Sequence, residues 1–269
     1  VNWTGVTIKT AILANLLKSL GYRVKISNTS VRLLYKGLSK GEADIFLGNW
    51  MPSQSEVCDP YFKSGTVVKF IPNMMNAKYT LAVPDYVAEA GLTHFKDIAR
   101  FKERLDGKIH GIEEGNDGNI IIQKMIEQNM YNLKDFKLIA SSEAGMLARV
   151  KSYLKEKKWI VFLGWSPHQM NKNINMVYLN GSTEETFGAD NGSATIYTNF
   201  RKGFDIEYPN ITKLLRNMTF PIHMMNEIMD VLHKNKSMKP ERAALDWIKG
   251  HPEIYTPWFK GVKTRDGKT

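Results

Sequence analysis

Apolar residues recur at helical spacing in some stretches of the chain, whereas in others they form short runs or alternate with polar residues. Helical spacing predicts helices at residues 8–20, 31–39, 95–101, 119–130 and 143–154, and through much of the last third, from 210 to 247. Short apolar runs and alternation predict strands at residues 22–26, 43–47, 67–71, 78–83, 108–112, 137–140 and 159–163. Because strands and helices alternate, the sequence predicts an α/β protein whose helices cover parallel sheets.

A pattern of glycine, tryptophan and proline occurs twice after an apolar strand. Residues 44–52 read DIFLGNWMP, and residues 160–167 read IVFLGWSP. Ligands of open α/β sheets lie outside the carboxyl ends of the strands, so this pattern predicts that Trp50 and Trp165 reach a shared crevice from two sheets. The alternative is a coincidence in which both indoles pack under loops.

Composition indicates an ordinary folded protein. The chain has 269 residues, of which 43% are hydrophobic and 24% charged, enough for one large domain or two modest ones. Its wholly apolar stretches are far shorter than the ~20 residues that span a bilayer. The single cysteine, Cys58, excludes an intrachain disulfide and a multi-cysteine metal site, and we expect its thiol to be buried and unreactive.

The net charge of +10 raises the question of a nucleic-acid partner. Only nine of the 37 basic residues are arginine, and the lysines are spread along the chain. Nucleic-acid surfaces cluster their basic residues and use arginine to read bases. We therefore expect no nucleic-acid partner.

The sequence contains no arrangement typical of a catalytic or metal site. Its six histidines are scattered, and phosphate-loop, dinucleotide and nucleophile-elbow patterns are absent. A catalytic role for His168 is less favoured than a structural one. Glu113 and Glu114 precede the turn GNDGN at residues 115–119, which suits either a capped turn or contact with a polar ligand. We expect no cofactor and no metal.

Four aromatic residues, Trp3, Trp50, Tyr79 and Trp165, lie at predicted strand ends or just after them. A quaternary ammonium group requires such rings, because it has no N–H to donate and is held by ring faces within about 6 Å. A desolvated contact of this kind contributes about 2 kcal/mol, so three or four together support micromolar binding. If these rings converge, they form an aromatic cage for a methylated ammonium compound; the alternative is that they pack under loops.

Five short motifs occur in order along the chain: NWT at residues 2–4, FLGNWMP at 46–52, AKYTLA at 77–82, GIE with GNDGN at 111–119, and FLGW at 162–165. In these motifs the sequence resembles the choline-binding branch of the ABC-transporter substrate-binding proteins for choline and glycine betaine. The resemblance extends over essentially the whole chain. It implies a two-lobed type II periplasmic-binding-protein fold, with a ligand cleft between two α/β lobes that close by a hinge motion.

The resemblance also implies how the chain divides. We expect crossings near residues 76–79 and 189–194, so that lobe I comprises residues 1–77 and 193–269 and lobe II comprises residues 78–192. The chain would then leave lobe I and return to it, which makes lobe I discontinuous.

The family's ligand-binding residues fall on identifiable positions of this sequence. Its cage residues correspond to Trp3 and Trp50 in lobe I and to Tyr79 and Trp165 in lobe II. Its hydroxyl-binding asparagine corresponds to Asn116. The resemblance therefore assigns the same four aromatic residues to the cage that their context already indicated.

Two departures from the family pattern concern specificity. The choline branch reads Trp-Thr-Asp, with an aspartate that helps to hold the choline hydroxyl, but this chain reads Trp3-Thr4-Gly5, and Glu114 replaces a proline after Glu113. Gly5 and Glu113 are therefore the candidate specificity positions. Loss of a carboxylate removes a hydrogen-bond acceptor and a negative charge. Glycine betaine, trimethylamine N-oxide or a sulfonium analogue thus become candidate ligands beside choline.

These features predict a non-catalytic, extracytoplasmic solute-binding protein that captures a methylated ammonium compound and delivers it to the permease of an ABC importer. We expect a monomer in the periplasm or another extracytoplasmic compartment, with the signal segment absent from this chain. Two alternatives use the same ligand class. One is an enzyme, which would need a nucleophile or metal beside the cage, and the other is a sensory domain fused to a receptor or permease.

Overall fold

The computed structural model describes residues 1–235 and 237–268. Its strands are β1 (Ile45–Met51), β2 (Val67–Pro84), β3 (Lys108–His110), β4 (Lys137–Ile139), β5 (Phe162–Ser166), β6 (Met176–Tyr178) and β7 (Ser193–Arg201). The longer helices are α1 (Thr4–Ser19), α2 (Val31–Lys40), α3 (Ser55–Lys63), α5 (Asp117–Glu127), α6 (Glu143–Lys155), α9 (Pro209–Asn217), α10 (Ile222–Lys234) and α11 (Pro240–Gly250). The short helices are α4 (Asp85–Glu89), α7 (Met170–Asn173), α8 (Phe204–Glu207) and α12 (Pro252–Tyr255), with 3-10 segments η1 (Phe95–Phe101), η2 (Met130–Asn132) and η3 (Thr256–Phe259).

The strands form one continuous sheet in the order β1-β7-β2-β5-β3-β4, with β6 paired to β2. β2 is 18 residues long and pairs antiparallel with β7, β5 and β6 along its length. β1 is antiparallel to β7, while β3 is parallel to β4 and β5. The prediction of two parallel sheets is therefore wrong for most pairs. Alternation of strands and helices does not fix the direction in which a later strand returns, and β7, which was not predicted, returns between β1 and β2.

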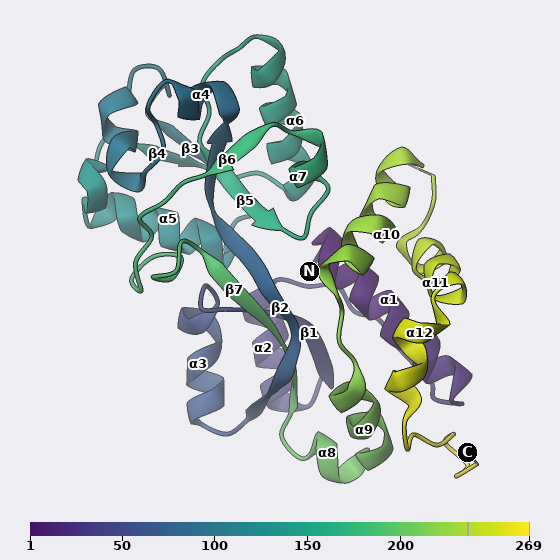
Figure 1. Cartoon of the computed structure of the whole chain (residues 1–269). Coiled ribbons are helices and arrows are strands. Elements are labelled where there is room, and N and C mark those ends of the chain that lie inside the picture. Colours follow the sequence, from purple (N-terminus) through teal and green to yellow (C-terminus); the bar gives the residue numbers. More distant parts are fainter. Residues whose placement is uncertain (236, 269) are drawn as a thin grey trace.

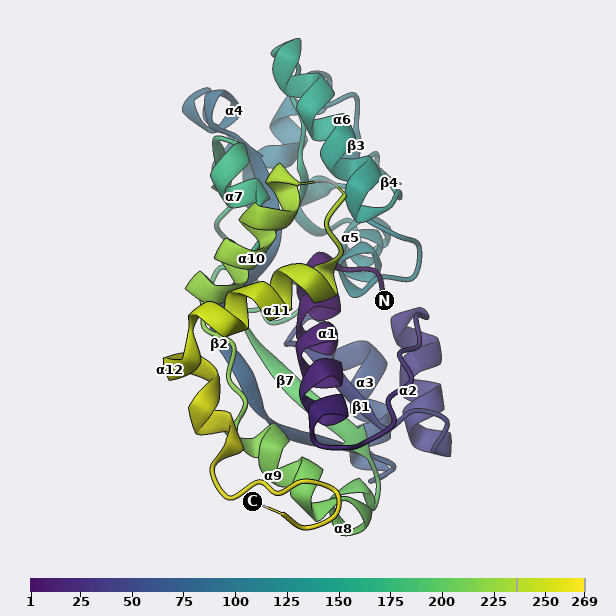
Figure 2. The same ribbon diagram turned by 90° about the vertical axis from the view of Figure 1, so that its right-hand side faces the viewer.

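Figure 1 shows two lobes that are joined by β2 and β7. Lobe II contains α4 to α7 and β3 to β6, and lobe I contains β1, α1 to α3 and α8 to α12. Where the two long strands pass between the lobes they lie side by side, and Ala77 pairs with Ala194. In Figure 2, α1 lies beside α10 and α11, and these three helices cover one face of the sheet in lobe I.

Three local predictions differ from the structure. Residues 22–26 are not a strand, but part of an irregular segment that lines a groove together with α1 and the start of β1. The alternation there records which side chains face inward, and not whether a neighbouring strand is in hydrogen-bonding register. The predicted strands 67–71 and 78–83 are parts of the single strand β2, and the predicted helix 95–101 is the 3-10 segment η1.

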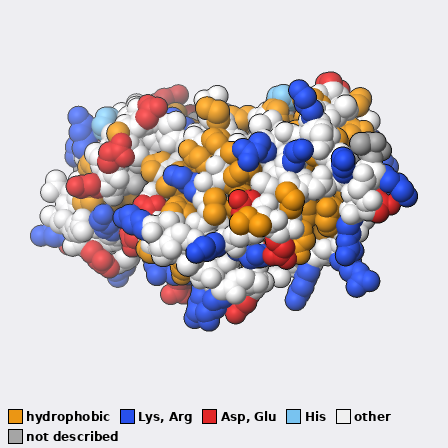
Figure 3. Space-filling view, turned by 90° about the horizontal axis from the view of Figure 1, so that it is seen from below, with side chains coloured by type: hydrophobic (Ala, Val, Ile, Leu, Met, Phe, Trp, Pro, Cys, Tyr) orange, Lys and Arg blue, Asp and Glu red, His pale blue; other side chains and the backbone are white. Residues whose placement is uncertain are grey.

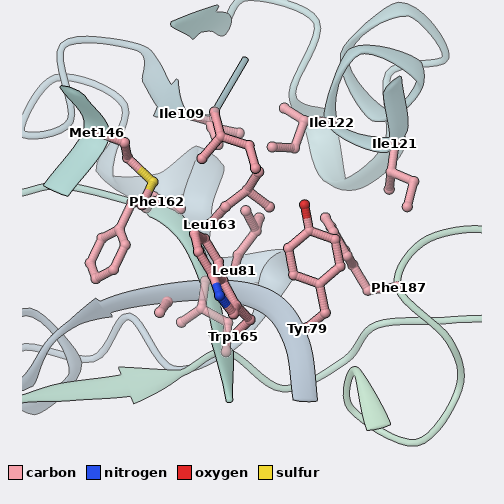
Figure 4. Packing of buried hydrophobic residues seen from close by; sticks show 14 of the residues in the cluster. Tyr79, Leu81, Ile109, Ile121, Ile122, Met146, Phe162, Leu163, Trp165 and Phe187 are labelled. Atoms are coloured by element: carbon pink, nitrogen blue, oxygen red, sulfur yellow. The ribbon is translucent and has the colours of Figure 1, made fainter. Parts of the chain in front are cut away.

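The core forms two hydrophobic clusters. One joins α1 to β1, β7 and the helices α9 to α11, and the other extends from α2 and α3 through β2 into lobe II. Figure 4 shows part of the second cluster, with Tyr79 and Trp165 next to the paired Leu81 and Leu163. Trp50 packs against both clusters, so β1 carries its indole to the boundary between the lobes.

The surface carries both signs of charge. On the face seen in Figure 3, lysine and arginine side chains are interspersed with acidic and apolar ones. Among the helices of the described residues, none is long and apolar enough to cross a membrane.

Candidate ligand-binding site

One pocket is lined by all five residues that were predicted to bind a ligand, namely Trp3, Trp50, Tyr79, Asn116 and Trp165. The space between its atoms, including the part open to solvent, measures about 530 Å³. Both lobes contribute further lining residues, among them Gly5, Val6, Lys9 and Met225 of lobe I and Ile112, Asp117 and Pro167 of lobe II. The pocket is therefore a cleft between the lobes.

Three of the aromatic rings form a chain across this pocket. The ring centroids of Trp50 and Tyr79 are 5.9 Å apart with an interplanar angle of 58°, and those of Tyr79 and Trp165 are 6.2 Å apart with an angle of 79°. Both tryptophans lie at strand ends, as predicted, because Trp50 is the last residue but one of β1 and Trp165 the last but one of β5. There Trp50 pairs with Ile196 and Trp165 with Tyr79. The first pair is tilted and the second is edge-to-face, so neither pair is stacked in parallel.

Two glycines of the sequence motifs make room for the pocket wall. A Cβ atom at Gly48 would lie 2.8 Å from Val6 Cγ2. A Cβ atom at Gly118 would overlap the Tyr79 hydroxyl and lie 2.9 Å from Leu163 Cδ1. Close packing against the pocket residue Val6 at Gly48, and against the cage residue Tyr79 at Gly118, therefore explains why both motifs contain glycine at these positions.

Asn116 begins α5 and ties the lobe II wall together. Its Oδ1 accepts hydrogen bonds from the Tyr79 hydroxyl at 2.9 Å and from the backbone N–H of Gly118 at 2.8 Å, which caps the helix. Its Nδ2 donates to Asp117 Oδ1 at 3.1 Å. Burial raises the pKa of Tyr79 well above its usual value, so its hydroxyl stays protonated and donates. Because the oxygen of Asn116 is occupied and its amide has a second N–H, this side chain is equipped to donate to a ligand.

Sequence reasoning missed two buried charged groups in the pocket wall. Asp117 Oδ2 accepts no hydrogen bond in the described part of the chain, and burial raises the Asp117 pKa to about 6, although the nearby Ser53 hydroxyl favours the ionised form. Lys9 is 2% exposed, and burial lowers its pKa to about 7. A signal for each was present: Asp117 belongs to the GNDGN turn, and Lys9 stands among the buried apolar positions of α1.

The two candidate specificity positions relate to the pocket in different ways. Trp3 Nε1 donates to Glu113 Oε1 at 2.5 Å, so this carboxylate of lobe II orients the indole of lobe I. Gly5 lines the pocket directly, and a Cβ atom there would meet Met229 Cε at 3.5 Å, an ordinary contact. Glu113 thus affects the pocket by orienting Trp3, whereas Gly5 leaves space in the pocket where a side chain would otherwise stand.

The start of α1 is held by lobe II, because this helix has no side-chain cap of its own. Glu143 accepts hydrogen bonds from the backbone N–H of Thr4 at 3.3 Å and from the Thr4 hydroxyl. His168 Nε2 lies 3.0 Å from the same carboxylate, and His168 Nδ1 accepts from the backbone N–H of Met170. Burial opposes ionisation of Glu143, but the hydrogen bonds from His168 and Thr4 outweigh it and lower its pKa. His168 therefore has the structural role that the sequence favoured.

The remaining reactive groups lie apart from the cage. Within residues 1–235 and 237–268, no cluster of three or more histidine, cysteine, aspartate or glutamate side chains could hold a metal ion. Cys58 is buried and free, and burial raises its pKa to about 12, so its thiol stays protonated.

Comparison with known proteins decides the family. Residues 1–250 match the family described as the substrate binding domain of ABC-type glycine betaine transport system. The chain belongs to this family. An ABC-transporter choline binding protein in complex with choline is 44% identical, with a TM-score of 0.96 and coverage of 99% of this chain and 92% of that one.

Two further relatives bear on the site. An ABC-transporter choline binding protein in an unliganded semi-closed conformation is 45% identical, with a TM-score of 0.91 and coverage of 100% of this chain and 93% of that one. The glycine betaine/carnitine transport binding protein GbuC of Listeria monocytogenes serotype 1/2a (strain 10403S) is 30% identical over 165 residues, or 61% of this chain and 53% of that protein.

Family membership confirms the two-lobed α/β fold that the sequence predicted. It also identifies the chain as an extracytoplasmic solute-binding protein that works with the permease of an ABC importer. The enzyme alternative is wrong, because members of this family bind solutes for transport.

Proposed function

We propose that the pocket binds a methylated ammonium compound, with the rings of Trp3, Trp50, Tyr79 and Trp165 around the ammonium group. The observation that carries this proposal is the convergence of four aromatic side chains from both lobes on one pocket. A fully methylated ammonium group has no N–H to donate, so ring faces are its principal source of binding energy. The ligands named for the relatives, choline, glycine betaine and carnitine, all carry such a group and support the proposal.

The hydroxyl oxygen of a ligand such as choline is proposed to lie near Asn116. The Oδ1 of this residue is committed to Tyr79 and to the cap of α5, while its amide keeps one N–H for a ligand acceptor. Glu113 contributes by holding Trp3, and Gly5 contributes by leaving space beside the ligand.

The proposed lobes are residues 1–77 with 193–269 and residues 78–192. The pairing of Ala77 with Ala194 supports this division, because it brings the outgoing and returning strands together at one place. A hinge at that place would let the lobes close on the ligand. The protein is proposed to act as a monomer, since one chain supplies both walls of the pocket.

The cage is tested with the variants Trp50→Ala and Trp165→Ala. Each should weaken binding of choline and of glycine betaine at least tenfold, which corresponds to about 1.4 kcal/mol, as measured by isothermal titration calorimetry. Trp159→Ala is the matched control, because this half-buried tryptophan of lobe II packs against Phe101 away from the pocket. If both cage variants keep the affinity of the unmodified protein while circular dichroism shows them folded, the pocket is not an ammonium cage.

A further inference from the structure

We propose that Lys9 binds an anionic group of the ligand, so that the site is built for zwitterions that carry a methylated ammonium group and a carboxylate. This inference rests on the proposed function, because it adds a second anchor to the same pocket. Lys9, which lies outside the aromatic cage, would then distinguish zwitterions from simple cations.

Lys9 is a buried cation without an anionic partner. Its Nζ donates to Asn73 Oδ1 at 2.8 Å and to the backbone oxygen of Leu47 at 3.3 Å, and it lies 5.4 Å from the centroid of the Phe220 ring. In the described part of the chain, no carboxylate lies within ion-pair distance of Lys9. Burial alone lowers its pKa to about 7, with no acidic side chain to offset the desolvation.

The geometry leaves one N–H of the ammonium for a ligand. A lysine ammonium carries three donors, of which Asn73 and Leu47 accept two. Both amide hydrogens of Asn73 are also committed, to the Leu47 oxygen and to Thr198 Oγ1, so the Asn73 oxygen is held toward Lys9. The lysine is thus fixed in the pocket wall with unused donor capacity. A buried charge in this condition is costly unless an opposite charge joins it.

Gly5 lines the same pocket as Lys9 and contributes no side chain to it. The two residues are four apart on α1 and therefore lie on the same face of the helix, one turn apart, and both line the pocket. Helical side chains lean toward the N-terminus of the helix, so that of Lys9 leans toward the turn that begins at position 5. A glycine there leaves room for a ligand group where a larger side chain would stand.

The opposite wall supplies the complementary charge. Asp117 of lobe II is 3% exposed, and its Oδ2 accepts no hydrogen bond within the described residues. It lies beside Asn116, whose oxygen accepts from the cage residue Tyr79. A zwitterion can therefore place its ammonium group against the rings and Asp117 and its carboxylate against Lys9. Each end of the ligand would then contact a different lobe.

Lys9 is tested by removing its charge while keeping its donor role toward Asn73. In Lys9→Gln, the side-chain amide still donates a hydrogen bond, and Lys9→Met serves as a second variant with an apolar side chain. Lys18→Gln is the matched control, because Lys18 lies on the same helix and is exposed. The affinities of glycine betaine, a carboxylate zwitterion, and choline, a cation without an anionic group, are measured by calorimetry for each variant.

Both Lys9 variants should lose at least tenfold in affinity for glycine betaine, whereas choline should bind as tightly as before or more tightly. A purely structural lysine would change both affinities by the same factor, and that result, or an unchanged betaine affinity, overturns the inference while leaving the cage intact. If the unmodified protein binds neither compound, the proposed function fails as well. If only one Lys9 variant folds, the ratio of its affinities for glycine betaine and choline tests the role of Lys9.

Discussion

The two walls of the pocket are held in place in different ways. In lobe II, Tyr79, Asn116 and Asp117 are joined by hydrogen bonds that stay within one lobe. In lobe I, the indole of Trp3 and the start of α1 are held by Glu113 and Glu143, two carboxylates of the opposite lobe. The lobe II wall is therefore complete on its own, whereas the lobe I wall is completed only when the lobes meet. The lobe II wall can therefore contact a ligand before the lobes close, whereas closure is needed to complete the lobe I wall.

The walls also differ in charge. Lobe I contributes the buried Lys9 and the open position Gly5, and lobe II contributes the buried Asp117. Opposite charges on opposite walls favour a ligand with two ends, because each end then stabilises the contact of one lobe. A ligand with a single positive charge can satisfy only the lobe II side.

The largest loss of ligand affinity is expected from a substitution in the lobe II wall, which is held together within one lobe. Gly118→Ala places a Cβ atom on the Tyr79 hydroxyl and displaces that ring from Asn116. The affinity for choline and for glycine betaine should fall by about a hundredfold, or about 2.8 kcal/mol. Alanine is a better helix former than glycine, so α5 itself should not suffer. Calorimetry together with circular dichroism separates loss of binding from loss of fold.

Gly5→Ala is the matched change in the other wall, since its Cβ atom would make only an ordinary contact with Met229. Both affinities should stay within about threefold of those of the unmodified protein, or about 0.7 kcal/mol. Equal losses in the two alanine variants would contradict the distinction between a complete wall and an open one.

Gly5→Asp is expected to change the preference between choline and glycine betaine more than the overall affinity. The new carboxylate would stand in the first turn of α1, four residues before Lys9, an arrangement in which acid and lysine attract each other. It would neutralise the lobe I wall and offer an acceptor to a hydroxyl group. The ratio of choline affinity to glycine betaine affinity should rise about tenfold, or about 1.4 kcal/mol. An unchanged ratio in competition titrations would mean that position 5 does not set the charge of this wall.

A change of pH is expected to affect the two ligands differently. Burial raises the pKa of Asp117 to about 6 and lowers that of Lys9 to about 7. As pH rises from 5 to 8, Asp117 gains its negative charge and Lys9 loses its positive charge, and both changes favour a cation. Choline affinity should therefore rise by about fivefold, or about 1 kcal/mol.

Glycine betaine should behave differently across the same range. Its affinity should fall above pH 7, where Lys9 is neutral in the free protein, and its binding should take up a proton there. The negative charge of Glu113 adds to the rise in the Asp117 pKa. Calorimetry in buffers of different ionisation enthalpy measures the proton uptake, and parallel pH profiles for the two ligands would contradict the assignment of charges.

The aromatic part of the site could be predicted from the sequence because it rests on local patterns. An apolar run followed by glycine and tryptophan identifies both Trp50 and Trp165, and the order of the motifs relates them to Trp3, Tyr79 and Asn116. The structure brings all five to one pocket. Their role in binding stays a prediction that the tryptophan variants address.

The charged part of the site could not be predicted in the same way. Whether Lys9 is buried depends on what packs against α1, which includes Phe220 and Asn73, both far away in the sequence. The unpartnered oxygen of Asp117 likewise depends on the whole environment of the turn. Such properties arise from tertiary packing and not from spacing along one element.

In the fold, the strand β7 likewise could not be predicted from local sequence patterns. Its first residues alternate, but Thr198 and Asn199 are polar and almost completely buried, so the alternation does not continue through the strand. The strand is buried because it lies between β1 and β2, a position that only the assembled sheet determines. Its insertion accounts for two of the antiparallel pairings, those with β1 and with β2.

The central claim, a zwitterion held between an aromatic cage and Lys9, is tested most directly by a crystal structure of the protein with glycine betaine. We expect the ammonium group within about 6 Å of the ring centroids of the cage, and the carboxylate within hydrogen-bonding distance of Lys9 Nζ. An ammonium group outside the rings of the cage, or a carboxylate that does not contact Lys9, would contradict this arrangement.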